Sequence, residues 1–254
     1  MNESSGCGND GAAGVGRTPD WNTIQSALRK WSDAFEADKG SSHIELMARV
    51  MDQLAHLIQC GHEEEALAFG ELAMDEMPDV PRVGYARDNW ELAFQCLIRL
   101  HEDACGQCDL YGGELADKLF RVIEFCRHTA VAGYVEMYQE LLGEAGLRRL
   151  VELFQPELEP IKKRAPGGYK RRPEFVKTFL ALRSIAEVTG DTDLKAELSL
   201  LEKPTARIYC DICVDFILDG RVKDARRWAK KGLKLFPGDE DLKYLARRPF
   251  NDDD

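Results

Sequence analysis

Two Cys-x-x-Cys pairs come nearest to a metal site, by residue type and spacing, in this 254-residue sequence. Cys105 with Cys108 and Cys210 with Cys213 would supply four thiolates, a common ligand set for structural zinc, and His101 lies one helical turn before Cys105. However, Cys210 and Cys213 fall on the apolar stripe of a predicted helix, and about a hundred residues separate the pairs, whereas the pairs of a zinc knuckle lie close together. We therefore predict that these cysteines pack in the core and that the chain binds no metal or cofactor. A zinc-stabilised or redox protein is the third interpretation that we consider.

A basic, Pro- and Gly-rich segment follows residue 155 and suits anion binding. Its cations have no acidic residue among them, and one tyrosine offers a stacking face. Such a cluster would contact the phosphates of a nucleic acid, dock on an acidic protein, or pair with acidic residues of its own chain. The candidate residues for an anionic partner are Lys162, Lys163, Arg164, Tyr169, Lys170, Arg171 and Arg172.

A second basic stretch, residues 220 to 237, also contains a tryptophan. Trp228 lies three residues after Ala225 and directly before Ala229, which places it on the apolar side of a helix. A tryptophan that stacks on bases should instead stand among the charges on the open face. We therefore predict that Trp228 packs within a helix pair.

Catalytic motifs are missing from the sequence. It contains no phosphate loop, nucleophile elbow or metalloprotease helix, and the Gly-rich start follows no predicted strand. We predict no catalytic residues and therefore a protein that is not an enzyme.

Composition and charge exclude several classes of protein. The chain is 44% hydrophobic and has a formal net charge of -11, which argues against a general binder of nucleic acid or membrane surfaces. Residues 1–150 hold 13 basic and 26 acidic residues, whereas residues 151–254 hold 21 and 19, so any anion-binding surface belongs to the second part. Neither a membrane-spanning run nor a secretory signal is visible, which predicts a cytoplasmic protein with reduced cysteines.

Apolar residues recur at spacings of three and four along nearly the whole chain, which predicts an all-α fold. Thr18-Pro19-Asp20 is typical of a helix start, and the apolar residues that follow continue to Phe35. Further helices are predicted near residues 41–58, 84–104, 113–130, 134–153, 173–188, 206–218, 222–236 and 239–248.

Internal repetition specifies the architecture further. In two separate stretches an alanine follows a glycine by five residues and a proline follows that glycine by seventeen. The glycine would end one helix in a tight turn, the alanine would let the next helix approach, and the proline would stop it, as in a tetratricopeptide-type pair. With Trp228, these repeat-packing residues are Gly61, Ala66, Pro78, Gly220, Ala225 and Pro237.

Together these patterns predict an irregular tetratricopeptide-like α-solenoid of about ten helices. The expected organisation is a disordered tail (1–18), a helical-repeat half (19–155), a basic loop (156–173), a second helical-repeat half (174–250) and an acidic tail (251–254).

Six stretches follow one another along the chain: "DWNTIQSALRKWSD", "HLIQCGHEEEALAFGELAM", "LIRLHEDAC", "LADKLFRVIEF", "YVEMYQELLGEAGLRRLVEL" and "DGRVKDARRWAKKGLKLFP". In this order they resemble the uncharacterised helical region that accompanies the SWIM zinc finger in many bacterial proteins. The finger needs a Cys-x-Cys pair before a Cys-x-His pair, and only the second half occurs here, at Cys60-Gly-His62 and Cys126-Arg-His128. The resemblance therefore implies a bacterial helical-repeat scaffold without the finger and without an assigned activity.

The function that we expect is the non-enzymatic binding of a protein or peptide in a concave groove between helices. The alternative is a nucleic-acid-associated protein that uses the basic loop 162–172.

Overall fold

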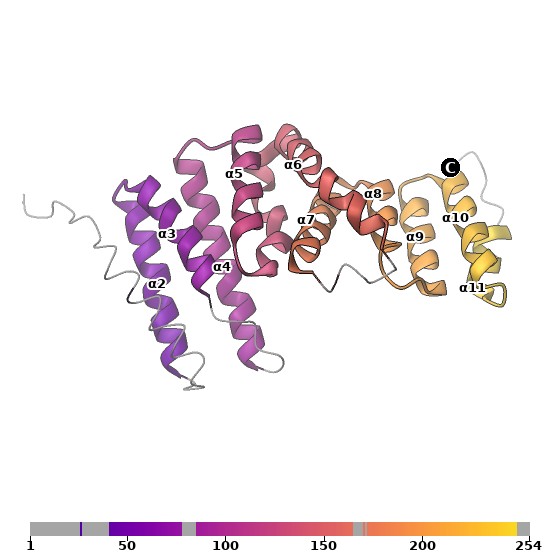
Figure 1. Ribbon diagram of the computed structural model, residues 1–254, viewed down its shortest axis with the longest axis horizontal. Helices are drawn as coiled ribbons and strands as arrows, with labels where there is room; N and C mark the ends of the chain where they lie inside the picture. The colour runs from indigo at the N-terminus through magenta and orange to yellow at the C-terminus, as the bar shows by residue number, and fades with distance from the viewer. Residues whose placement is uncertain (1–25, 27–40, 78–84, 165–169, 171, 248–254) are drawn as a thin grey trace, which may run out of the picture.

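The computed structural model describes residues 26, 41–77, 85–164, 170 and 172–247, and within these residues every element of regular secondary structure is a helix (Figure 1). The prediction of an all-α chain is confirmed. Ten α-helices and one 3-10 segment, η1, form the described part: α2 (Ser41–Gln59), α3 (Glu63–Glu76), α4 (Tyr85–Gln107), α5 (Gly112–Phe125), η1 (Thr129–Tyr138), α6 (Gln139–Lys162), α7 (Pro173–Thr189), α8 (Thr192–Ser199), α9 (Ala206–Leu218), α10 (Val222–Leu235) and α11 (Glu240–Arg247). Of the helix predicted to begin near Pro19, only Ser26 is described, and it is helical, while the two predicted tails lie outside the described residues.

The helices follow one another in chain order along the long axis, from α2 at one end to α10 and α11 at the other (Figure 1). Some helices pack mainly on the next helix in the chain, as α3 does on α4 and α9 on α10. In the middle of the chain the packing skips one element: α5 packs on α6 across η1, and α7 packs chiefly on η1 across α6. None of the helices in the described part has the length and apolar character that crossing a membrane requires.

The two repeat signatures fall where helix pairs turn. Gly61 and Gly220 have φ values of 74° and 71°, a left-handed conformation that favours glycine, and each lies between two packed helices. Ala66 and Ala225 are almost completely buried on the second helix of each pair, where a larger side chain would hold the helices apart. Pro237 follows the end of α10, and Pro78 lies outside the described residues.

The basic segment becomes a loop later than the sequence predicts, because α6 continues to Lys162 through Pro156 and Pro160. Each proline lacks an N–H donor and costs a helix interior about 3 kcal/mol. Both prolines lie on the exposed face of α6, where water can hydrogen-bond to the freed carbonyls, while Leu158 and Ile161 are buried. Burial of this apolar stripe outweighs the local preference, and the prediction of a loop at 156–162 is wrong.

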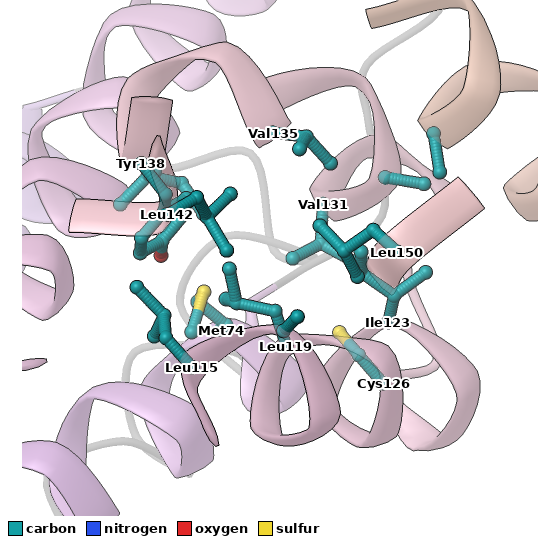
Figure 2. Packing of buried hydrophobic residues seen from close by; sticks show 14 of the residues in the cluster. Met74, Leu115, Leu119, Ile123, Cys126, Val131, Val135, Tyr138, Leu142 and Leu150 are labelled. Atoms are coloured by element: carbon teal, nitrogen blue, oxygen red, sulfur yellow. The ribbon is translucent and has the colours of Figure 1, made fainter. Parts of the chain in front are cut away.

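The hydrophobic core forms two clusters. The larger one runs from Val50 in α2 to Leu198 in α8, and the smaller one joins α9, α10 and α11. Figure 2 shows part of the larger cluster, in which Met74 of α3, Leu115 of α5 and Leu142 of α6 point toward one another. Because the larger cluster includes residues on both sides of the basic loop, that loop does not divide the core.

Candidate functional site

The four paired cysteines lie in different parts of the core. Cys105 belongs to the larger cluster, and its Sγ lies 3.7 Å from Nδ1 of His101. Cys213 belongs to the smaller cluster, and its thiol donates a hydrogen bond to the carbonyl of Ala225 at 3.3 Å. Burial raises the pKa of each of these two thiols to about 12, which disfavours the thiolate that zinc requires. The described residues hold no group of three His, Cys, Asp or Glu side chains suited to a metal ion. The structure therefore does not assemble the four-thiolate site.

Most basic side chains of the loop that the structure describes interact with the chain itself. Nζ of Lys162 lies 2.9 Å from Glu159 and 2.5 Å from Glu197. Burial alone would lower the pKa of Lys162, but these two carboxylates raise it. Nζ of Lys170 lies 3.6 Å from Glu202.

Two arginines of this loop share an aromatic partner. Arg164 lies over the ring of Phe175 at 4.8 Å and Arg172 over the same ring at 5.7 Å, and Arg172 also reaches Glu174 at 3.5 Å. Lys163 is exposed at the end of α6, while Tyr169 and Arg171 lie outside the described residues.

Trp228 packs against α9. The centroid of its ring lies 6.3 Å from that of Tyr209 and 6.4 Å from that of Phe216. Nζ of Lys231 lies over the Trp228 ring, 4.1 Å from its centroid. The indole is half-buried, because one part of it also lines a hollow on the neighbouring surface.

That hollow belongs to a groove, which we name the α6–α8 groove. One hollow of about 680 Å³ lies between α6, α7 and α8, and a second of about 510 Å³ extends from α6 and α8 to Trp228. The two hollows share Val151, Asp191 and Leu194 in their walls, so they adjoin each other. The apolar lining of the groove comprises Leu147, Val151, Ile185, Val188, Leu194, Leu200 and Trp228.

Carboxylates border this apolar lining. Glu144, Asp191, Asp193 and Glu197 line the groove together with a single guanidinium, that of Arg148. Two of the four acids have basic partners: Glu197 pairs with Lys162, and Asp193 pairs with Arg221 at 2.6 Å. The hydrogen bond from Arg221 lowers the pKa of Asp193. Glu144, in the first hollow, and Asp191, where the two hollows meet, make no ion pair within the described part of the chain.

Local sequence signals position the walls. Gly143, with φ of 54°, breaks the helix before Glu144 and so starts the long part of α6 that lines the groove. Gly190, with φ of 66°, ends α7, and the side chain of Asp191 accepts the N–H of Leu194 at 2.9 Å and caps α8. The groove is therefore bounded by two glycine breaks and one N-cap.

Sequence reasoning did not identify the groove residues. Val151 and Val188 belong to the same apolar stripes as the core, and nothing in their spacing marks them as half-exposed. The available signal was the Gly190-Asp191 turn, which shows where α8 starts but not which surface it faces.

Comparison with protein-family models, with curated proteins and with solved structures yields no match for this chain.

Proposed function

We propose that this chain is a tetratricopeptide-like scaffold that binds a segment of another protein in the α6–α8 groove and catalyses no reaction. The observation that carries the proposal is the continuous apolar lining, which crosses three helices and ends at Trp228. Helical-repeat proteins commonly use surfaces of this kind for extended or helical peptides. The glycine turns at Gly61 and Gly220, with buried alanines behind them, support the repeat architecture.

The charges of the groove favour one kind of partner. Glu144 lines the first hollow and Asp191 lies where the two hollows meet, and both residues are exposed near the starts of helical segments. We propose that the bound segment carries two or three apolar side chains and, next to them, a Lys or Arg that pairs with these carboxylates. The resemblance to helical regions of bacterial SWIM proteins supports a scaffold role.

The nucleic-acid alternative has less support. Lys162, Lys170 and Arg172 already pair with carboxylates of the same chain, so phosphate binding would have to break these ion pairs.

Peptide display tests the proposal. A random library of peptides about 12 residues long would be selected on the immobilised full chain, and enriched sequences measured by fluorescence polarisation. We expect apolar peptides with a basic residue, and we expect Glu144→Lys to weaken their binding by about tenfold or more. The matched control is Glu157→Lys, which makes the same charge change on an exposed part of α6 outside the groove.

A second variant addresses the apolar lining. Val151→Glu places a charge at the point where the two hollows join, and its helicity would be checked by circular dichroism. Selected peptides that bind both groove variants as tightly as the parent chain would contradict the proposal.

A further inference from the structure

A second cleft lies between α3 and α5, far along the chain from the α6–α8 groove. It has a volume of about 370 Å³, within the range of small-molecule sites. Its walls carry opposite charges: Glu71 and Asp75 come from α3, whereas Lys118 and Arg121 come from α5. Its apolar part comes from Val122, Phe125 and Cys126.

A buried polar chain lies beneath this cleft. His101 is completely buried on α4, and its Nδ1 lies 2.8 Å from the hydroxyl of Tyr138. Its Nε2 points toward Oε1 of Glu71 at 3.7 Å, too long for a hydrogen bond, and has no other partner among the described residues. A buried nitrogen left without a partner costs about 1 to 3 kcal/mol, and in a native protein it calls for an explanation.

Two neighbouring side chains keep Glu71, on the α3 wall of the cleft, negatively charged. Nζ of Lys118 crosses the cleft to Oε1 of Glu71 at 2.5 Å. Burial by itself would raise the pKa of Glu71, but His101 and Lys118 hold it below its ordinary value, so the carboxylate stays ionised. Glu71 and Lys118 are therefore a fixed pair at the base of the cleft.

Asp75 and Arg121 are the other two charged residues of the cleft, and they are available to bind a ligand because the ion pair of Glu71 and Lys118 does not use them. Oδ1 of Asp75 accepts the backbone N–H of Arg127 at 2.7 Å, which leaves the second carboxylate oxygen as an acceptor. Arg121 is exposed on α5, and no carboxylate of the described residues lies within ion-pair distance of it. Beside them, Phe125 leaves 77% of its surface exposed, unusually much for so large an apolar side chain.

We infer that this cleft binds an amino-acid-sized zwitterion with an apolar side chain. Asp75 would accept hydrogen bonds from the ammonium group, Arg121 would bind the carboxylate, and Phe125 and Val122 would cover the apolar side chain. Because Glu71 and Lys118 already pair with each other, a simple anion would pair with Arg121 but face Asp75, and a simple cation would pair with Asp75 but face Arg121. A ligand with both charges satisfies both groups.

Isothermal titration calorimetry of the full chain tests this inference with leucine and phenylalanine as probes. Two analogues separate the charges: leucinamide lacks the carboxylate and N-acetylleucine lacks the ammonium group. We expect saturable binding of the free amino acids and about tenfold weaker binding of each analogue. Arg121→Gln should weaken leucine binding by about tenfold but leave the affinity for leucinamide unchanged, because leucinamide has no carboxylate. Asp75→Asn should also weaken leucine binding by about tenfold but leave the affinity for N-acetylleucine unchanged, because N-acetylleucine has no ammonium group.

Controls separate this site from the rest of the molecule. Arg99→Gln removes an exposed guanidinium of α4 outside the cleft and should leave leucine binding unchanged. Val151→Glu, in the α6–α8 groove, should also leave it unchanged, so the two sites can fail independently. Titrations without saturable heat up to about 10 mM of either amino acid, or analogues that bind as well as leucine, would overturn the inference.

Discussion

Nζ of Lys177 on α7 donates a hydrogen bond to the backbone carbonyl of Glu124, 53 residues earlier at the end of α5, at 2.7 Å. The same ammonium reaches the carbonyl of Cys126 at 2.5 Å, so one lysine satisfies two acceptors where α5 stops. Lys177 is 8% exposed, and burial lowers its pKa. This contact ties α7, which follows the basic loop, to α5, which precedes it.

Loss of this ammonium should destabilise the whole chain. Lys177→Met keeps most of the volume of the side chain but leaves two carbonyls without their donor, and we expect the free energy of unfolding to fall by about 2 to 3 kcal/mol. Urea denaturation followed by circular dichroism measures this change. Lys230→Met, on the exposed face of α10, should change it by less than about 0.5 kcal/mol. Equal effects of the two changes would refute the capping role.

The helical state of residues 156–162 predicts the sign of a proline substitution. Pro160→Ala restores an N–H donor inside α6 and should raise the free energy of unfolding by about 1 to 3 kcal/mol. In a loop the same change would lower stability slightly, because proline restricts the unfolded chain. Pro173→Ala is the control, since proline at the first turn of α7 breaks no helical hydrogen bond. Thermal denaturation measures the change. A melting temperature of Pro160→Ala equal to or below that of the parent chain would contradict a helix at residues 156–162.

Gly232 is a close-contact position that the repeat pattern does not predict. A Cβ at this residue would lie 2.8 Å from Cβ of Tyr209 and 3.0 Å from Cδ1 of Leu242. We expect Gly232→Ala to lower the free energy of unfolding by about 1 to 3 kcal/mol, although alanine favours a helix. Gly113→Ala, in the first turn of α5 with open space around it, should be neutral or stabilising. Similar melting temperatures for the two variants would contradict the contact.

His101 predicts a dependence of stability on pH. Burial lowers its pKa from 6.5, the nearby carboxylate of Glu71 opposes this shift, and the charge of Lys118 adds to it. Below about pH 6.5 the unfolded chain therefore binds a proton that the folded chain does not, and the stability present above this pH is lost as the pH falls. When the pH falls from 7.5 to 5.5, the free energy of unfolding of the parent chain should decrease by about 1 kcal/mol more than that of His101→Gln.

Urea denaturation at these two pH values gives the change in the free energy of unfolding with pH for each chain. These slopes are compared, and not the absolute stabilities, because His101→Gln also disturbs the hydrogen bond to Tyr138. This pH range lies above the titration of Glu71, whose pKa is lowered. Parallel slopes for both chains would show that His101 takes up its proton equally well in the folded state.

The sequence predicted some elements closely and others poorly, for identifiable reasons. α7, α9 and α10 agree with the predicted spans to within about a residue, because each has a clear apolar stripe and a turn signal at one end. The predicted helix 113–130 is wrong beyond Phe125. There the backbone leaves α5, Arg127 donates its N–H to Asp75, and η1 begins at Thr129. These partners lie far away in the sequence, so no local pattern indicates the break.

The sequence by itself determined the all-helical class, the glycine turns at Gly61 and Gly220, and the inward side of Trp228. Each of these follows from residue type and from spacings within a single helix or helix pair. Only the tertiary structure decided that α6 extends through two prolines, that the paired cysteines lie in separate core clusters, and that His101 lies below Glu71. These outcomes depend on which helix faces bury one another, and that balance between distant segments overrides preferences of a few kcal/mol in any one segment.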